Sequence, residues 1–399
     1  MKLNRSKEAI VFTKYFDPVS AGREINLFKT YSGFCQRGWK VTLFTSRSTH
    51  IKKNVLKNNE IVGGINVRRY DENQYIFPKW ITGVNFDHKI ICFHGLQHFP
   101  DLFILSYLLF LKMLGKKNFV VMFSSHGLYS YRYQFDVSFL GVIKKHIDNI
   151  LTATLINFVV DGFRSVSNKE AYFMRASGVK KIMIIENGLP SEALKRNHKP
   201  SIKIKKLVQN NKKYVLQIGR IDKSKNFETV IRAMTLVKDR KVKCFIVGPT
   251  DDKDYADLLS RLIINHNLQN QVYMLGEVTG SSKYYLLKHA AAYLQMSHSE
   301  GFGNAVYEAM GQGCVCIVSA GTALSNLIKN FRNGFTVRAN DYAGVAKKID
   351  YVLDPGNKKT VLKMQKINIQ TSSTRTWEKT SQDVERFYLN VYKKLHPDP

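Results

Sequence analysis

The sequence predicts an α/β protein built from two Rossmann-like domains, each with a parallel sheet covered by helices on both faces. Short apolar runs of strand length recur along the chain, and amphipathic stretches of helical length lie between most of them. Continuous apolar runs of this kind are typical of parallel strands that are buried on both faces. The alternation stops at residues 191–212 and then restarts, and 399 residues are enough for two such domains.

The first series lies in residues 1–190. Helical spacing of apolar residues follows the first strand, from Ile25 to Cys35, and Gly38 stands where that helix should end. Longer helices are predicted at Asp101–Leu114 and Phe139–Asn157. The predicted strands are Ala9–Phe12, Val41–Thr45, Ile65–Arg69, Lys89–Phe93, Phe119–Ser124, Phe163–Val166 and Ile182–Ile185.

The second series follows a basic segment, 191–212, which we interpret as a linker. A polar gap at 370–373 separates this series from a final amphipathic helix at 376–395. The predicted strands are Tyr214–Ile218, Lys243–Val247, Gln271–Leu275, Ala292–Met296 and Val315–Val318. The other predicted helices lie near 227–238, 253–265, 281–290, 304–312 and 342–353.

The charge is strongly positive, with 61 Lys and Arg against 31 Asp and Glu, a net +30. The excess is spread over both halves of the chain and predicts an anionic partner: a membrane surface, a phosphorylated substrate or a nucleic acid. Five scattered cysteines without a C-x-x-C pattern indicate reduced core thiols. We expect no signal peptide, and the apolar stretch Leu102–Leu114 is too short to span a bilayer.

The loop after Tyr214–Ile218 is the first candidate site. Gly219 permits close approach of a ligand to the backbone, and Arg220 and Lys225 can both reach a phosphate, Arg through its fork and Lys as a point charge. The alternative is a solvated loop in a lysine-rich protein, and a motif of this length leaves the two about equally plausible.

The second candidate site follows the strand Ala292–Met296, over Ser299–Met310. Glycines 301 and 303 leave the backbone bare, and Asn304 is the expected N-cap of the next helix, whose free N–H groups favour an anion. Glu300 and Glu308 flank this turn, and carboxylates accept hydrogen bonds from sugar hydroxyls. The alternative is a capped helix with two surface glutamates.

Two strand-end histidines and one acidic pair need separate interpretation. His126 follows Phe119–Ser124 and can bind a sugar hydroxyl or stabilise developing charge, but a structural role is the more frequent one; His94 poses the same question. Asp252-Lys253-Asp254 has the D-x-D form of a manganese site. Its place at a helix start favours a cap instead.

Together, these motifs resemble the retaining GT-B glycosyltransferases of family 4 (glycosyl transferases group 1) over nearly the whole chain. Glu300 to Glu308 matches the family's E-x7-E signature, and Gly219-Arg220 with Lys225 matches its phosphate-binding segment. Four further segments match, namely Glu186-Asn187-Gly188, Gly248-Pro249, Gly276-Glu277-Val278 and Asn333-Gly334-Phe335.

The resemblance implies an architecture and a set of site residues. An acceptor-binding domain at 1–190 and a nucleotide-sugar-binding domain at 213–370 would face a cleft, with helix 376–395 packed back on the first domain. Arg220 and Lys225 would bind the diphosphate and Glu308 the ribose, and Glu300 and His126 would be catalytic groups at the donor sugar. The implied donor-binding residues are Gly22, Gly219, Arg220, Lys225, Gly276, Glu277, Val278, Phe302, Gly303, Asn304 and Glu308.

The expected reaction is transfer of a sugar from a nucleotide diphosphate sugar to an acceptor hydroxyl, with retention and without a metal or other cofactor. We expect a cytoplasmic enzyme on the inner face of the membrane, held by anionic lipid, with a lipid-linked glycan acceptor in surface polysaccharide, capsule or lipopolysaccharide biosynthesis. A nucleotide-sugar epimerase or a phosphorylase of the same fold is the alternative. A nucleic-acid-binding protein is more remote, because no RNP motif, zinc finger or basic–aromatic block is present.

Overall fold

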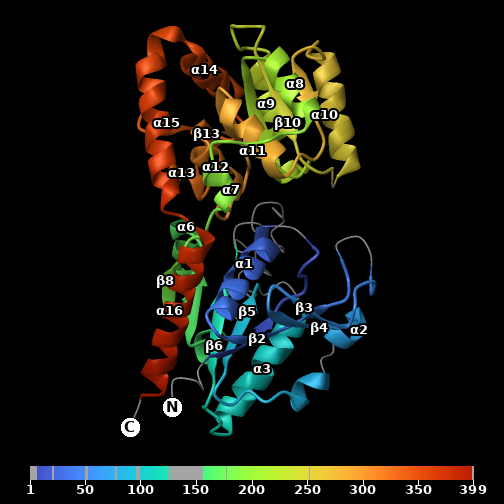
Figure 1. Ribbon diagram of the computed structural model, residues 1–399, viewed down its shortest axis with the longest axis vertical. Helices are drawn as coiled ribbons and strands as arrows, with labels where there is room; N and C mark the ends of the chain where they lie inside the picture. Colours follow the sequence, from blue (N-terminus) through green and yellow to red (C-terminus); the bar gives the residue numbers. More distant parts are fainter. Residues whose placement is uncertain are drawn as a thin grey trace, which may run out of the picture. The chain divides into compact units, whose positions relative to one another are not determined.

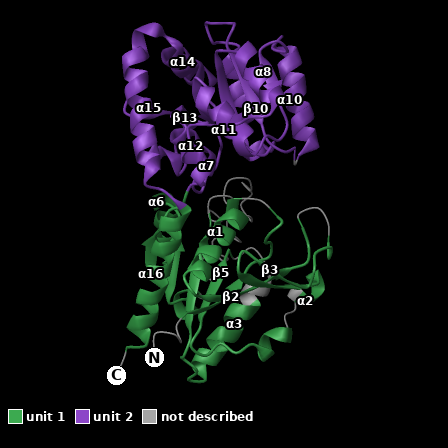
Figure 2. Ribbon diagram, viewed as in Figure 1, with its two compact units in different colours: residues 1–188, 377–399 green, residues 189–376 purple. Residues whose placement is uncertain are grey.

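The chain forms two compact units, which we describe separately (Figure 2). Unit 1 comprises residues 1–188 and 377–399, and unit 2 comprises residues 189–376. The computed structural model describes residues 7–19, 22–49, 53–76, 79–95, 99–124, 126, 156–176, 178–250 and 252–397. The helix predicted at Phe139–Asn157 therefore falls outside the described residues, except for its last two.

Unit 1 is built on an eight-stranded sheet of order β3-β4-β2-β1-β5-β6-β7-β8 (Figure 1). Neighbouring strands are parallel except for β3, which pairs antiparallel with β4. The strands are β1 (Glu8–Phe12), β2 (Lys40–Ser46), β3 (Asn59–Val62), β4 (Ile65–Tyr70), β5 (Ile90–His94), β6 (Val120–Ser124), β7 (Gly162–Ser165) and β8 (Ile182–Ile184).

β3 is a strand that the apolar pattern did not reveal. It is short and largely exposed at the edge of the sheet, so it has no continuous apolar run. Gly63 and Gly64 form the turn into β4 with φ values of 58° and 85°. Two consecutive residues with positive φ are what a two-residue hairpin requires, and glycine adopts them without strain.

The helices of unit 1 cover both faces of its sheet. Helix α1 (Gly22–Gln36) packs against the terminal helix α16 (Trp377–Leu395), which returns to this unit from the far end of the chain (Figure 1). The Ser381 hydroxyl donates to the Thr30 carbonyl at 2.7 Å, and the Trp39 indole donates to Glu385 at 2.7 Å. The remaining helices are α2 (Glu72–Ile76), η2 (Lys79–Gly83), α3 (Phe99–Met113) and α6 (Asn168–Ala176).

Unit 2 is built on a six-stranded, fully parallel sheet of order β11-β10-β9-β12-β13-β14. Its strands are β9 (Tyr214–Ile218), β10 (Lys243–Val247), β11 (Val272–Met274), β12 (Ala292–Gln295), β13 (Val315–Ser319) and β14 (Gly334–Val337). Its helices are α7 (Ser191–Leu194), α8 (Ile202–Asn210), η3 (Lys223–Lys225), α9 (Phe227–Met234), α10 (Lys253–Asn265), α11 (Gly280–His289), α12 (Asn304–Gly311), α13 (Leu324–Leu327), α14 (Tyr342–Leu353), η4 (Pro355–Asn357) and α15 (Lys358–Ser373).

Two segments of unit 2 differ from the sequence-based expectation. The basic segment 191–212, expected to be a linker, is folded into unit 2, where Ile204 and Val208 of α8 are buried while its lysines stay at the surface. The polar residues 370–373, expected as a gap, are the last turn of α15. The hydroxyls of Thr371, Ser372 and Ser373 hydrogen-bond to helix carbonyls, as Ser372 does to Asn368 at 2.9 Å.

The strand order places a reversal point in each sheet. In unit 1, β1 pairs with β2 on one side and β5 on the other, and in unit 2, β9 pairs with β10 and with β12. Ligands of doubly wound sheets bind beyond the carboxyl ends of the strands at such a reversal. The loops after β1, β5, β9 and β12 are therefore the ones to examine.

Helix α3 carries the most apolar stretch of the chain. Its inner face packs under the sheet through Ile104, Leu105 and Leu108, whereas Phe103 and Phe110 are about half exposed. Among the described residues, no helix combines the length and the apolar character needed to cross a bilayer.

Candidate functional site

The loop after β9 is fixed by its own turns and by the sheet. The Gly219 N–H donates to the Val247 carbonyl at 2.9 Å, which continues the β9–β10 pairing by one residue. The Asp222 carboxylate accepts from the Ser224 N–H at 2.9 Å and caps η3. The loop therefore presents Arg220 and Lys225 from a defined backbone.

Gly219 and Gly248 let two loop backbones touch. Gly248 has a φ of 153°, and a Cβ atom built on it would lie 1.8 Å from the Gly219 carbonyl oxygen. No side chain can fit there, so a residue other than glycine at 248 would push the two loops apart. The loop that follows β9 and the loop that follows β10 therefore pack directly against each other through their backbones.

Asn226 joins three loops, a role that the sequence did not predict. It has a φ of 51°, and its side-chain amide donates to the Met296 carbonyl at 3.1 Å and to the Ala339 carbonyl at 2.8 Å. The His298 N–H also donates to the Ser224 carbonyl, at 2.9 Å. These bonds hold the loop after β9 against the loop after β12.

Lys225 and Glu300, predicted from two separate motifs, lie together. The Lys225 Nζ is 3.1 Å from Oε1 and 3.2 Å from Oε2 of Glu300. Both side chains are mostly buried, with 17% and 15% of their surface exposed. Each charge therefore has the other as a partner, and an arriving anion would compete with Glu300 for the ammonium group.

Arg220 is more exposed than Lys225. Its side chain is 52% exposed, and its Nη2 lies 3.5 Å from Oδ2 of Asp222. Because half of the Arg220 side chain is exposed to solvent, a phosphate can reach its guanidinium group.

Helix α12 begins at Asn304, and Gly303 occupies the N-cap position that we had expected for Asn304. This expectation was wrong because Gly303 adopts a φ of 89°, and a Cβ atom there would lie 2.3 Å from Cδ2 of Leu324. The Phe302 ring stacks on Tyr307 with centroids 4.5 Å apart, which fixes the turn. The first N–H groups of α12 and the helix dipole favour an anion at this end.

Glu308 is buried on α12 and has its own cation. The Lys283 Nζ of α11 is 2.9 Å from Oε2 and 3.0 Å from Oε1, and the Tyr284 hydroxyl donates to Oε1 at 3.4 Å. Burial, reinforced by the Glu308 charge, raises the pKa of Tyr284, which stays protonated. The sequence missed Lys283, because nothing local marks one lysine of a helix as the partner of a glutamate on another.

The segment Gly276-Glu277-Val278 follows β11 at the same edge of the sheet. Gly276 has a φ of 71°, and its carbonyl accepts from the Gly248 N–H at 2.9 Å. Glu277 is exposed and Val278 is half-buried. The segment is therefore anchored beside the glycine pair and presents its backbone outward.

In unit 1, the candidate residues are Gly22 and His126, and His126 belongs to a hydrogen-bonded chain with His94 and Tyr31. Gly22 is the first residue of α1; the two residues before it lie outside the described ranges. The Tyr31 hydroxyl is 2.6 Å from Nε2 of His94, and Nδ1 of His94 is 2.7 Å from Nε2 of His126. His126 has a φ of 50°, an uncommon conformation for a residue with a side chain.

Both histidines are neutral at pH 7. Burial lowers the pKa of His94 and of His126 well below the ordinary value, and the charges of Arg164 and Arg23 lower both further. A neutral imidazole carries one N–H, so the chain runs in one of two senses. In the first sense, the Tyr31 hydroxyl donates to Nε2 of His94, the Nδ1–H of His94 donates to Nε2 of His126, and His126 carries its proton on Nδ1. In the opposite sense, the Nε2–H of His126 donates to His94, and Nδ1 of His126 is a hydrogen-bond acceptor.

Arg164 is a buried cation that the sequence did not single out. Its guanidinium donates to the Asn26 side chain at 3.1 Å, to the Asn187 side chain at 3.3 Å and to the Ile185 carbonyl at 3.2 Å. The segment Glu186-Asn187-Gly188 thus takes part in holding a buried charge in unit 1.

The reversal point of unit 2 gathers groups of complementary kinds. Arg220, Lys225 and the start of α12 provide positive potential, and Glu300 and Glu308 provide hydrogen-bond acceptors. This set fits a ligand that carries both anionic groups and hydroxyls, since cations bind the former and carboxylates accept from the latter.

The chain resembles known proteins both in sequence and in structure. Residues 198–369 match the family described as Glycosyl transferases group 1. An uncharacterised glycosyltransferase of Methanocaldococcus jannaschii is 33% identical over 190 residues, which are 47% of this chain and 46% of that protein. The GDP-mannose:cellobiosyl-diphosphopolyprenol alpha-mannosyltransferase of Xanthomonas campestris is 24% identical over 271 residues, 66% of this chain and 65% of that protein. The chain thus spans about half to two thirds of these curated relatives.

Among solved structures, Anabaena HepE in complex with UDP and glucose aligns with a TM-score of 0.74 and 16% identity, covering 96% of this chain and 100% of that one. A likeness at this identity establishes the fold. The two Rossmann-like units predicted from the sequence are confirmed, and their fold is that of GT-B glycosyltransferase structures.

Proposed function

We propose that this protein is a glycosyltransferase that moves a sugar from a nucleotide diphosphate sugar to an acceptor hydroxyl. The observation that carries the proposal is the gathering of Arg220, Lys225, Glu300 and the start of α12 at the reversal point of unit 2. The match of residues 198–369 to glycosyl transferases group 1 supports it independently.

In the proposed complex, the donor's diphosphate binds Arg220, Lys225 and the first N–H groups of α12. Lys225 then turns from Glu300 to the phosphate, which releases the Glu300 carboxylate to accept from hydroxyls of the donor sugar. Phe302 and Gly303 line the sugar with their backbone, Glu308 accepts from the ribose hydroxyls, and the segment 276–278 contacts the base.

We propose that the reaction proceeds with retention and needs no metal. Departure of the nucleoside diphosphate places negative charge on its oxygens, and fixed positive groups that face this charge lower the barrier. The positive groups Arg220, Lys225 and the α12 dipole support this proposal. Asp252 caps α10, where it accepts from the Tyr255 N–H at 2.9 Å. His126, neutral at pH 7, is suited to hydrogen-bond a sugar hydroxyl.

We further propose a lipid-linked glycan acceptor and attachment to the inner face of the cytoplasmic membrane. The net charge of +30 supports an anionic surface as partner, because basic residues near such a surface gain electrostatic attraction. The name of the Xanthomonas relative refers to a saccharide on a diphosphopolyprenol. Sedimentation with vesicles tests this part: binding should rise with anionic lipid and fall with salt, and indifference to both would remove it.

A thermal-shift screen with UDP-, GDP- and ADP-sugars tests the donor site directly, because a ligand of the folded protein raises its unfolding temperature. We expect one nucleotide class to stabilise the chain, and Lys225→Ala to abolish the shift. Lys223→Ala is the matched control, since Lys223 lies in the same turn but is exposed. No shift with any nucleotide, or an equal shift in Lys225→Ala, would refute the proposed donor site.

A further inference from the structure

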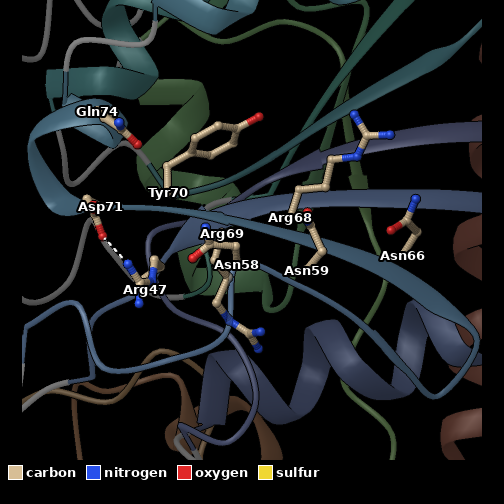
Figure 3. A pocket seen from close by; sticks show the side chains of 9 residues that line it. All are labelled: Arg47, Asn58, Asn59, Asn66, Arg68, Arg69, Tyr70, Asp71 and Gln74. Carbon is tan, nitrogen blue, oxygen red and sulfur yellow. Dashed lines mark hydrogen bonds and ion pairs between the residues drawn. The ribbon is translucent and has the colours of Figure 1, made fainter.

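Unit 1 contains a pocket of about 490 Å³ that is lined by none of the candidate site residues described above. It lies beside β3 and β4 at the edge of the sheet, and its wall consists of three arginines, three asparagines, a tyrosine, an aspartate and a glutamine (Figure 3). Its volume is within the range of small-molecule sites, which are mostly apolar. A wall in which every side chain is polar suits a hydrophilic ligand instead.

Two of the three arginines have their charge compensated by the protein. Arg47 donates to the Asp71 carboxylate and to the Leu56 carbonyl, both at 2.7 Å. Arg69 is buried and pairs with Glu60. These two guanidinium groups therefore shape the pocket more than they attract an external anion.

Arg68 is the third arginine of the pocket, and it differs from Arg47 and Arg69 in its contacts. Within the part of the chain that the structure describes, it makes no ion pair, and its guanidinium lies 5.9 Å from the Phe44 ring centre. Alternation along β4 sends Arg68 and Tyr70 to one side and Arg69 to the other, as Figure 3 shows. The pocket thus has an exposed Arg68 without a carboxylate to neutralise it.

The surroundings of Arg68 are rigid and rich in hydrogen-bonding groups. The Tyr70 ring stacks on Trp80 with centroids 4.4 Å apart and planes 3° apart, and Trp80 stacks on Phe44 at 4.8 Å. Asn59 and Asn66 add amides that can both donate and accept. An arginine fork binds a carboxylate or phosphate through two parallel bonds, while amides pair with hydroxyls.

We propose that this pocket binds a sugar bearing an anionic group, a carboxylate or a phosphate, and that Arg68 is its anchor. The assignment of that sugar to the acceptor rests on the function proposed above, because the donor site lies in unit 2. The acceptor would then be an acidic or phosphorylated glycan, and Arg68 would select it over a neutral one.

The test uses the full-length chain and three probes: glucose 6-phosphate, glucuronate and glucose, followed by isothermal titration. We expect one or both anionic sugars to bind and glucose not to bind, and the two anionic probes separate phosphate from carboxylate recognition. Arg68→Gln should weaken that binding at least tenfold. Arg386→Gln, an exposed arginine of α16 in the same unit, should leave it unchanged.

The same titrations in Lys225→Ala separate this pocket from the donor site. Binding that persists in Lys225→Ala and is lost in Arg68→Gln supports the pocket. Failure of both anionic sugars to bind, or binding that survives Arg68→Gln, overturns it. The nucleotide-dependent thermal shift of Arg68→Gln should equal that of the wild type, so a failure of the donor proposal is seen separately.

Discussion

The side chains near the reversal points of the two sheets differ in charge. Those of unit 1 are neutral, and those of unit 2 are charged. In unit 1, Tyr31 of α1 and the strand-end histidines His94 and His126 are neutral and joined by hydrogen bonds of 2.6 and 2.7 Å; Tyr31 and His94 are buried, and His126 is half-buried. In unit 2, the corresponding groups lie in loops and on helices, are charged and form ion pairs, as in Lys225–Glu300 and Lys283–Glu308. A neutral hydrogen-bonded chain keeps its geometry when a ligand arrives, whereas ion pairs can exchange partners with it.

The largest loss of activity should come from substitutions at Lys225 and Glu300, because Lys225 must exchange Glu300 for the donor phosphate. Each of Lys225→Met and Glu300→Gln should lower kcat/KM by about 10²–10³-fold, the usual cost of removing one group that stabilises transition-state charge. The double variant should be no better than either single one. Steady-state kinetics of the two single variants and the double variant measure this. Wild-type activity in the double variant would show that Lys225 and Glu300 only neutralise each other's charge and do not act on the substrate.

The next effect concerns the neutral chain of unit 1. Tyr31→Phe leaves Nε2 of His94 buried without a partner, which should lower the free energy of unfolding by about 1–3 kcal/mol. It should also lower kcat more than it raises KM, because the proton position on His126 is no longer fixed. Tyr273→Phe, which loses only a hydrogen bond at the surface, is the control. Equal urea stability of the two variants would contradict the account.

A smaller effect is expected at the cation that the sequence missed. Lys283→Met removes the partner of Glu308, and we expect the KM for the donor to rise about tenfold, or ~1.4 kcal/mol, with kcat little changed. Lys288→Met, on the exposed end of the same helix, should leave KM as it is. A change in kcat alone would place Glu308 in the chemical step instead of in donor binding.

The smallest expected effect is a pH dependence of stability that arises from the two histidines of unit 1. The pKa values of His94 and His126 are lowered by folding, so the unfolded chain binds more protons below its ordinary histidine pKa. Stability should therefore be constant above about pH 6.5 and fall as the pH drops below it, by at most ~1.4 kcal/mol per pH unit for each group. Unfolding temperatures from pH 7 to 5 measure this, and His94→Asn should flatten the slope.

The site was most predictable where its geometry is local. Gly219 to Lys225 and Glu300 to Glu308 lie within single strand–loop–helix segments, so spacing alone indicated their place. Their partners were not predictable: Lys283 and Asn226 reach the site across the sheet, and only the fold brings them there. The same holds for the contact of His94 with Tyr31 on α1.

The fold was predictable where strands are buried on both faces. All the predicted strands are present. β3 was missed because it is largely exposed, and β14 was missed because its four residues, which include a glycine and a threonine, form no continuous apolar run although most of them are buried. Helix α15 was missed because its residues are mostly polar and contact the rest of unit 2 through few buried groups, such as Met364 and Asn368. Patterns of apolar residues report burial, and elements with little burial leave little pattern.

One measurement tests the central claim most directly. The chain is incubated with the donor that the thermal-shift screen identifies and with diphosphate-linked saccharides as acceptors, and released nucleoside diphosphate and the new glycosidic bond are followed by NMR. The account predicts release that depends on the acceptor, continues in EDTA, preserves the anomeric configuration of the donor and is lost in Lys225→Met. Release without acceptor, or a product of inverted configuration, would contradict it.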